Sequence, residues 1–183
     1  MKKNILLIAL FAMAVTSYGQ ENKFTLSGGY AFANVEETDT DASGFRINGL
    51  YEFLAVGTKV AHGFSVGYIG TSASTTLQGD PIDYKISSWP IYYAPKFIFG
   101  QKSVKGFIKG ALGWQFSKIK REGPAVEASA NDSGFYAGAA VGVMKDVNEK
   151  LFINLEYEWA YQGNSYYRDG FMNTINLGIG YNF

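Results

Sequence analysis

The sequence predicts an all-β protein, namely an eight-stranded antiparallel transmembrane β-barrel with up-and-down meander topology that follows an N-terminal signal peptide. Three observations predict this fold class. Apolar residues recur at every second position rather than every 3.6 positions, which is the period of strands. The alternating segments end at clusters of Gly, Asn, Asp, Ser or Lys. Aromatic residues make up 16% of the chain and charged residues 17%, with 22 glycines, a composition typical of a surface that contacts lipid.

The first residues have the pattern of a secretory signal peptide. Lys2 and Lys3 are basic, residues 5–15 are apolar, and Ser17-Tyr18-Gly19 forms a small-x-small cleavage site. The apolar run is shorter than the roughly 20 residues that a spanning helix needs. We therefore expect a signal peptide at 1–19 and one barrel domain at 20–183.

Composition excludes several other classes of protein. The chain has no cysteine, so disulfides, thiolate metal sites and lipid attachment at the cleavage site are excluded. Removal of Lys2 and Lys3 leaves slightly more acidic than basic residues, and no basic stripe suggests a nucleic-acid partner. We expect no cofactor.

Eight segments carry the period-two pattern. They span residues 23–34, 44–55, 63–74, 84–99, 106–120, 134–145, 150–162 and 172–183. In each, one face holds most of the aromatic and aliphatic residues, and the other is mostly Gly, Ala, Ser, Thr and Asn. A soluble lipocalin-like barrel also has one apolar face, turned inward. Because a barrel of this size has room inside only for modest side chains or one small ligand, the aromatic face should point outward, into lipid.

Connection lengths predict the orientation. Short links at 56–62, 101–105 and 146–149 alternate with longer polar links at 35–43, 75–83, 121–133 and 163–171. Outer-membrane barrels have short periplasmic turns and long outer loops, so both termini should face the periplasm. An even strand number also permits closure, which removes edges that would leave backbone groups unsatisfied in lipid.

Two local features have structural interpretations. Pro90 and Pro95 each remove a ladder donor, which predicts a bulge or break in the fourth strand. His62, the single histidine, falls in the first short link, and we interpret it as a turn residue rather than a catalytic base.

The inward face carries six charged residues. They are Arg46, Glu52, Lys96, Lys109, Glu156 and Glu158. Unpaired charges in a narrow lumen are costly, so our hypothesis is a salt-bridge network that closes or constricts the barrel. The alternative, that these groups fill a solvated interior, stays open.

The predicted outer loops and the outward face hold the other candidates. Asp39, Asp41 and Ser43-Gly44 resemble the start of a calcium loop, but Leu50 stands where its bidentate carboxylate belongs, so no metal site is predicted. Tyr166 and Tyr167 either anchor the barrel or contribute to a surface-binding patch. The three tryptophans are candidates for aromatic girdles at the membrane surface. They are Trp89, Trp114 and Trp159.

Three segments carry a resemblance to a known family. They are residues 87–97, 109–114 and 178–183. The chain resembles the small porin-like outer membrane protein beta-barrel domain family, whose members are similar to OmpX, OmpW and the membrane domain of OmpA. In that family a terminal aromatic with alternating apolar residues is recognised by the barrel-assembly machinery, and Ile179, Tyr181 and Phe183 match this signal.

The resemblance implies a multi-pass bacterial outer-membrane protein, in contact with lipid and lipopolysaccharide and often monomeric. Its function stays open. We expect a structural or surface-interaction role in the cell envelope, with a surface ligand held by the outer loops. The alternative is a narrow passive channel for small solutes lined by the six inward charges. A lipid A-modifying enzyme is the third class, and no credible catalytic pair supports it.

Overall fold

The computed structural model describes residues 20–35, 40–55, 57–77, 80–100, 103–124 and 126–183. The predicted signal peptide lies outside these residues. Within them, no helix is long and apolar enough to cross a bilayer.

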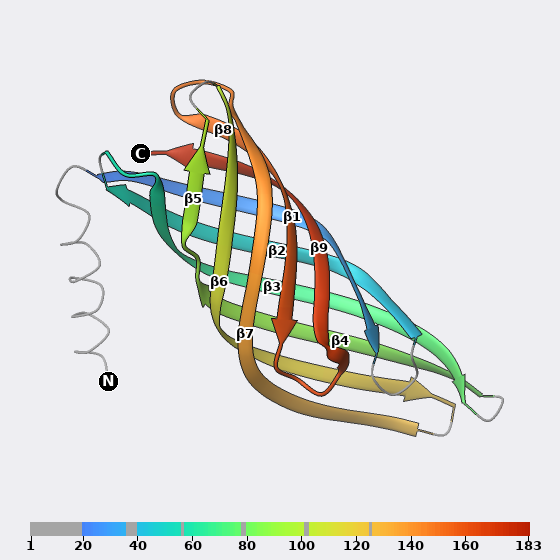
Figure 1. Cartoon of the computed structure of the whole chain (residues 1–183). Coiled ribbons are helices and arrows are strands. Elements are labelled where there is room, and N and C mark those ends of the chain that lie inside the picture. The colour runs from blue at the N-terminus through green and yellow to red at the C-terminus, as the bar shows by residue number, and fades with distance from the viewer. Residues whose placement is uncertain (1–19, 36–39, 56, 78–79, 101–102, 125) are drawn as a thin grey trace.

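The described chain forms nine antiparallel strands. These are β1 (Gln20–Val35), β2 (Thr40–Ala55), β3 (Val60–Leu77), β4 (Asp80–Tyr93), β5 (Lys96–Phe99), β6 (Val104–Gly123), β7 (Val126–Asp146), β8 (Leu151–Gln162) and β9 (Tyr167–Asn182). Except for β4 and β5, which both pair with β3 and β6, neighbours in sequence pair in space, and β1 also pairs with β9, from Lys23–Asn182 to Val35–Tyr167. The sheet therefore closes into the ring drawn in Figure 1.

The nine strands occupy eight positions of the barrel, as predicted. The predicted strand at 84–99 is broken between Tyr93 and Lys96, and both pieces, β4 and β5, lie between β3 and β6. The break falls at Ala94-Pro95, where proline cannot donate to the ladder, so the predicted interruption is confirmed there. Pro90 remains within β4, opposite Gln115 of β6.

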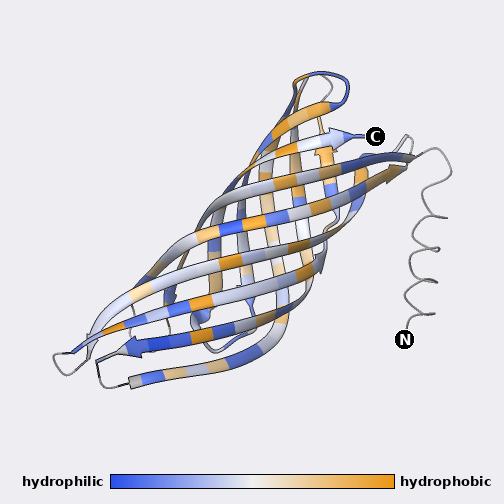
Figure 2. Ribbon diagram, turned by 180° about the vertical axis from the view of Figure 1, so that it is seen from behind, coloured by the Kyte–Doolittle hydropathy of each residue, from blue (hydrophilic) through white to orange (hydrophobic). Residues whose placement is uncertain are grey.

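The apolar face points outward, as the volume argument predicts. Figure 2 shows hydrophobic and hydrophilic residues alternating along the strands. Large apolar side chains are exposed on every strand, for example Leu177 at 63% and Phe64 at 61%. The inward face holds small residues, as predicted, but also several tyrosines and two phenylalanines. An exterior of this kind is stable only where lipid replaces water.

The strands extend further beyond the ring at one end of the barrel than at the other. At one end, here called the terminal end, lie Gln20, Phe183 and the short connections around 57–59 and 147–150. At the other, the hairpin end, the strands extend well into the connections predicted at 75–83 and 121–133, so those predicted loops are wrong. Antiparallel strands satisfy their backbone groups mutually even where the alternating pattern stops, and sequence periodicity does not register such extensions.

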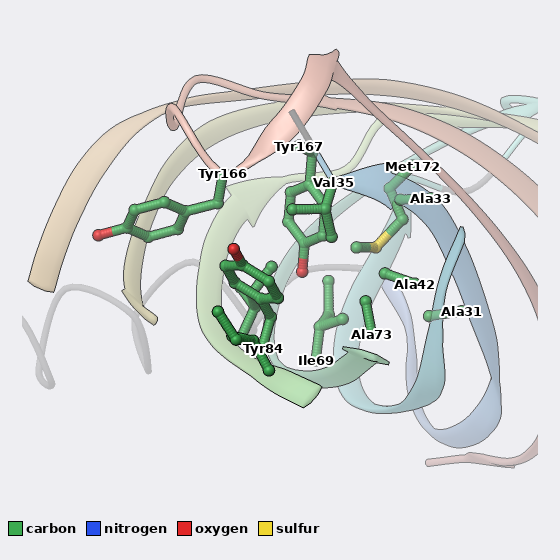
Figure 3. Packing of buried hydrophobic residues seen from close by; sticks show 12 residues of the cluster. Ala31, Ala33, Val35, Ala42, Ile69, Ala73, Tyr84, Tyr166, Tyr167 and Met172 are labelled. Carbon is green, nitrogen blue, oxygen red and sulfur yellow. The ribbon is translucent and has the colours of Figure 1, made fainter. Parts of the chain in front are cut away.

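Two apolar clusters occupy the interior near its ends. Near the terminal end Phe107, Met144 and Phe152 pack together. Near the hairpin end a larger cluster includes Ile69, Tyr84, Tyr167 and Met172 (Figure 3). The charged residues lie between these layers.

Candidate functional site

The middle of the barrel interior is organised around Glu158 and Arg46. Arg46 Nη1 lies 2.7 Å from Glu158 Oε1, and its Nη2 donates to the Tyr92 hydroxyl at 2.8 Å. The Tyr136 hydroxyl donates to Glu158 Oε1 at 2.5 Å. Arg46 and Glu158 are each 1% exposed. Such a pair is tolerated in a dry interior because its hydrogen bonds replace those of water.

Lys109 links both glutamates of β8. Its Nζ lies 2.8 Å from Glu156 Oε1 and 3.0 Å from Glu158 Oε2. Glu158 therefore accepts from Arg46, Lys109 and Tyr136, so both of its oxygens are bonded. Strand alternation explains the placement, since residues 156 and 158 of β8 share the inward face.

The remaining two predicted interior charges form a separate pair. Lys96 Nζ lies 2.7 Å from Glu52 Oε1, and the lysine is fully buried. The same Nζ sits 4.8 Å from the centre of the Phe107 ring, a cation–π contact. The structure thus brings the six charged residues together in two groups.

The interior leaves little free volume around these charges. The hollow beside Lys109 and Glu156 measures about 10 Å³, about the room that a single water needs. The two apolar clusters lie on either side of this layer. Each of the six charges therefore has an oppositely charged neighbour in this layer, at distances of 2.7 to 3.0 Å.

Sequence reasoning missed the tyrosines of this layer. Tyr92 and Tyr136 are 2% and 0% exposed, and their rings stack with centroids 5.0 Å apart. Tyr92 precedes the outward Tyr93, and Tyr136 follows the outward Phe135. Each tyrosine was therefore grouped with the aromatic residues of the outward face. Strict alternation from Trp89 or Phe135 would have placed both inside.

The other predicted residues lie on the outward face. Trp89, Trp114 and Trp159 are about half exposed, and Trp159 stacks on Phe171 at 4.5 Å. Near the terminal end, Ile179, Tyr181 and Phe183 also point outward.

His62 lies in β3 rather than in the predicted turn, which corrects that prediction. Its ring stacks between Phe53 and Tyr93 on the outward face, and its Nδ1 is hydrogen-bonded to the Tyr93 hydroxyl. Pairing of β3 begins at Val60, because β5 provides a partner strand there.

The hairpin end carries a free strand edge. β7 pairs with β6 along its whole length to Val126, but its pairing with β8 starts only at Tyr136. In Figure 1 the β6–β7 hairpin correspondingly projects beyond the β8–β9 hairpin. Residues 126–134 of β7 therefore lack a strand partner on one side within the part of the chain that the structure describes.

The direction of the unpaired backbone groups follows from the ladder. The Phe135 carbonyl accepts from Gly163, so odd-numbered residues of β7 direct their N–H and C=O to the free side. The Ser133 N–H is bonded by the Asp132 carboxylate. The open part of the edge is thus formed by Glu127, Ser129 and Asn131.

A hollow lies beside this edge, and we call it the rim notch. It is lined by Val35, Ile119, Arg121, Ala128, Ser129, Ala130, Ser165 and Tyr166 and has a volume of about 260 Å³. Ala128 pairs with Arg121 and Ala130 with Ile119, so small side chains leave the space open. The notch exists because the β8–β9 hairpin is shorter than the neighbouring β6–β7 hairpin.

The loop between β8 and β9, residues 163–166, lies beside the notch and is held in place by polar contacts. The Asp132 carboxylate accepts from the Ser165 N–H at 3.1 Å and from its hydroxyl at 3.2 Å, and Asn164 Nδ2 donates to the Ser117 hydroxyl. The hydrogen bond from the Ser165 backbone holds the pKa of the Asp132 carboxyl below its ordinary value. The loop is therefore anchored to β6 and β7.

Two polar groups reach the notch. Tyr166 is 8% exposed, and its hydroxyl has no hydrogen-bond partner among the described residues. Figure 3 shows its ring directed away from Tyr167 and Met172. The Arg121 guanidinium lies 5.1 Å from the centre of the Tyr84 ring. The sequence singled out Tyr166 and Tyr167 together, but Tyr167 is buried inside, with its hydroxyl 2.8 Å from the Thr71 hydroxyl.

Comparison with known proteins gives one family. Residues 5–183 match the model of the outer membrane protein beta-barrel domain. No curated protein matches the sequence.

Several solved structures share the fold. Neisserial surface protein A has a TM-score of 0.60 at 16% identity, covering 87% of this chain and 97% of its own. A major outer membrane protein from Thermus thermophilus has a TM-score of 0.63 at 12% identity, covering 88% and 99%. Ail, the attachment invasion locus protein of Yersinia pestis, in complex with the heparin analogue sucrose octasulfate, has a TM-score of 0.54 at 24% identity, covering 88% and 99%. At these identities the likeness shows the fold.

Proposed function

This chain belongs to the outer membrane protein beta-barrel domain family, and we propose that it is a surface-interaction protein which binds an extended polypeptide segment along the free edge of β7. The family places the barrel in the bacterial outer membrane. The observation that carries the proposal is the set of unpaired backbone groups at Glu127, Ser129 and Asn131.

A free edge of this kind is a template for strand addition. An incoming strand forms main-chain hydrogen bonds with it, each contributing about 0.5–1.5 kcal/mol net. In the closed ring of described strands such edges are absent, so the hairpin end is where a partner strand can add. Ail, of the same fold, has been crystallised with a ligand, which supports ligand binding as a role for barrels of this shape.

The proposal includes the orientation and the biogenesis of the barrel. With both termini in the periplasm, the hairpin end and its free edge face the outside of the cell. Ile179, Tyr181 and Phe183 then form the signal for the barrel-assembly machinery, Trp89, Trp114 and Trp159 belong to aromatic girdles, and lipid and lipopolysaccharide surround a monomer. Residues 1–19 are the signal peptide.

The interior supports a structural role rather than transport. The paired charges and the two apolar clusters leave no wide path among the described interior residues, which argues against the channel alternative. A catalytic role has no support from His62, whose ring is held between two aromatic rings on the outward face. We propose that the protein is not an enzyme.

The test uses the refolded barrel in lipid nanodiscs and immobilised seven-residue peptides of the pattern Thr-Val-Thr-X-Thr-Val-Thr, which favour extended conformations. We expect the wild type to bind these peptides. The double variant Ser129→Pro/Asn131→Pro, which removes two N–H donors on the free side, should lose binding at least about tenfold.

The matched control is Ser129→Ala/Asn131→Ala. It changes the same side chains and keeps the backbone donors, so it should bind like the wild type. Equal binding by the proline and alanine variants, or no binding of any peptide by folded wild type, would contradict strand addition.

A further inference from the structure

The outward face of β4 and β6 changes from apolar to basic toward the hairpin end. Trp89 of β4 and Phe116 of β6 lie directly opposite each other, and both are 53% exposed. The next outward residues toward the hairpin end are Ser87 and Lys118. Figure 2 shows hydrophilic residues gathered at this end of β6. Along these two strands the apolar band that contacts lipid therefore ends at the Trp89–Phe116 pair.

Lys118 lies at the depth of the lipid headgroups. Two residues of an antiparallel strand rise about 7 Å, which a strand tilt of about 40° reduces to about 5 Å along the membrane normal. Headgroups occupy about 5–8 Å on each side of the hydrocarbon core. Lys118 therefore stands at the level of lipid phosphates, and Lys120 stands two residues further out on the same face.

The basic residues of this face are only partly neutralised. Lys118 and Lys120 are exposed and form no ion pair within the part of the chain that the structure describes. Lys85 lies directly opposite Lys120, and its Nζ is 2.6 Å from Glu122 Oε2. Like charges directly opposite each other destabilise a sheet. Glu122 offsets one of the three lysines, so an external anion would stabilise the other two.

A hollow of about 630 Å³ adjoins Lys118. Six of the residues that line it are Ser87, Trp89, Phe116, Lys118, Asn131 and Ser133. Lys118 is flanked by Ser87 on β4 and by Asn131 on β7. The hollow therefore has aromatic rings on the side of the lipid and an ammonium group with small polar neighbours on the side of the water. This combination suits the region of a lipid where its phosphate joins its apolar part.

The acidic groups near the hollow are bonded elsewhere or lie beyond it. Asp132 also lines the hollow, but its carboxylate accepts from the Ser165 N–H and from the Ser165 hydroxyl. Glu122 and Glu127 lie opposite each other, and Glu122 is four residues further than Lys118 toward the tip of the hairpin. Neither glutamate stands between Lys118 and the lipid.

We propose that this hollow, with Lys118 and Lys120, binds a phosphate group of lipid A, the membrane anchor of lipopolysaccharide. Lipid A is the occupant because in the proposed orientation the hairpin end faces outward, where lipopolysaccharide forms the leaflet. The two ammonium groups form charge-assisted hydrogen bonds with the phosphate oxygens, and Trp89 and Phe116 contact the apolar part. The inference rests on the proposed orientation but not on strand addition, because it uses outward side chains rather than the backbone of the β7 edge.

The experiment measures lipid binding to the refolded barrel in detergent micelles by native mass spectrometry. The probes are lipid A with both phosphates, lipid A from which the phosphates have been removed, and phosphatidylglycerol. The wild type should bind phosphorylated lipid A about tenfold more tightly than either of the others, the effect of one charge-assisted hydrogen bond. In Lys118→Gln/Lys120→Gln, which keeps most of each stem, the ratio between phosphorylated and dephosphorylated lipid A should fall to near one.

The matched control is Lys145→Gln/Lys150→Gln, which removes two exposed lysines from the terminal end and should keep the wild-type ratio. Equal binding of phosphorylated and dephosphorylated lipid A by the wild type, or a ratio that Lys118→Gln/Lys120→Gln does not alter, would overturn the site. Phosphatidylglycerol bound as tightly as lipid A would overturn the assignment to lipid A. Peptide binding to the β7 edge is measured separately, so its failure is distinct from these outcomes. The migration of unheated protein on gels shows that each variant is folded.

Discussion

Glu158 and Tyr166 are both more than nine-tenths buried, yet they differ in the hydrogen bonds that their side-chain oxygens make. Glu158 accepts hydrogen bonds from Arg46, Lys109 and Tyr136. The Tyr166 hydroxyl has no partner in the described structure. The same contrast holds for the backbone, since β7 is paired on both sides in the barrel and on one side at the rim.

The difference separates the polar groups that hold the barrel together from the polar groups that are available to bind a partner. Inside, each of the six described charges has an oppositely charged partner, and these ion pairs hold the strands of the barrel together. At the hairpin end, donors and acceptors stay available, and water satisfies those that are exposed until a partner replaces it. The predictions below compare these two regions by making matched changes in each.

The largest effect is expected from proline in the paired part of β7. Val141 has neighbours on both sides, Ile108 and Tyr157, and lies in the outward apolar band. Val141→Pro leaves a ladder acceptor unsatisfied in lipid, which costs several kcal/mol or prevents folding. Ser129→Pro, at an odd-numbered position on the free edge, should change the free energy of unfolding by less than about 0.5 kcal/mol. Urea unfolding in lipid vesicles measures both, and equal losses would contradict a free edge.

The next effect concerns the buried charges. Glu158→Ala leaves Arg46 without a carboxylate and should lower the free energy of unfolding by about 3–5 kcal/mol. Glu122→Ala removes the exposed partner of Lys85 and should cost less than about 1 kcal/mol. Tryptophan fluorescence during urea unfolding gives both values. Similar small losses in the two variants would mean that the interior charges are solvated rather than paired.

A smaller effect is expected from acid at the loop below the notch. Hydrogen bonds from Ser165 lower the pKa of Asp132, so the anchoring is present above the ordinary carboxyl pKa and is lost as the pH falls through the lowered value. The Ser165 amide should exchange faster in that acidic range. Asp132→Asn should remove this pH dependence, and an unchanged pH profile in the variant would show that another group is responsible.

Period-two alternation predicted the outward face and the ring of eight positions, because contact with lipid dictates those residues directly. The break at Pro95 was predicted separately, from the backbone donor that proline lacks. Alternation did not predict the length of the β6–β7 hairpin, since the described residues 121–124 and 127–133 are exposed or half-buried and carry no alternation of large apolar residues. The inward positions of Arg46 and Glu158 also follow from the alternation of inward and outward side chains along each strand. Their contact does not, because it depends on the register between β2 and β8 across the barrel.

The rim notch was beyond sequence reasoning for the same reason. It arises from a difference in length between neighbouring hairpins, and Arg121 had no distinguishing pattern around it. Tyr166 was noticed as part of an aromatic pair. Only the structure separates its hydroxyl from that of Tyr167, which bonds to Thr71.

The free edge of β7 is tested most directly by residue-resolved amide hydrogen exchange of the barrel in nanodiscs, without any ligand. The account predicts alternation at the rim, with fast exchange at Ser129 and Asn131 and slow exchange at Ala128 and Ala130, whose N–H groups point to β6. At 137–143, where β7 is paired on both sides, all amides should exchange slowly. Slow exchange at Ser129 and Asn131 as well would mean that the edge is covered, and would contradict the account.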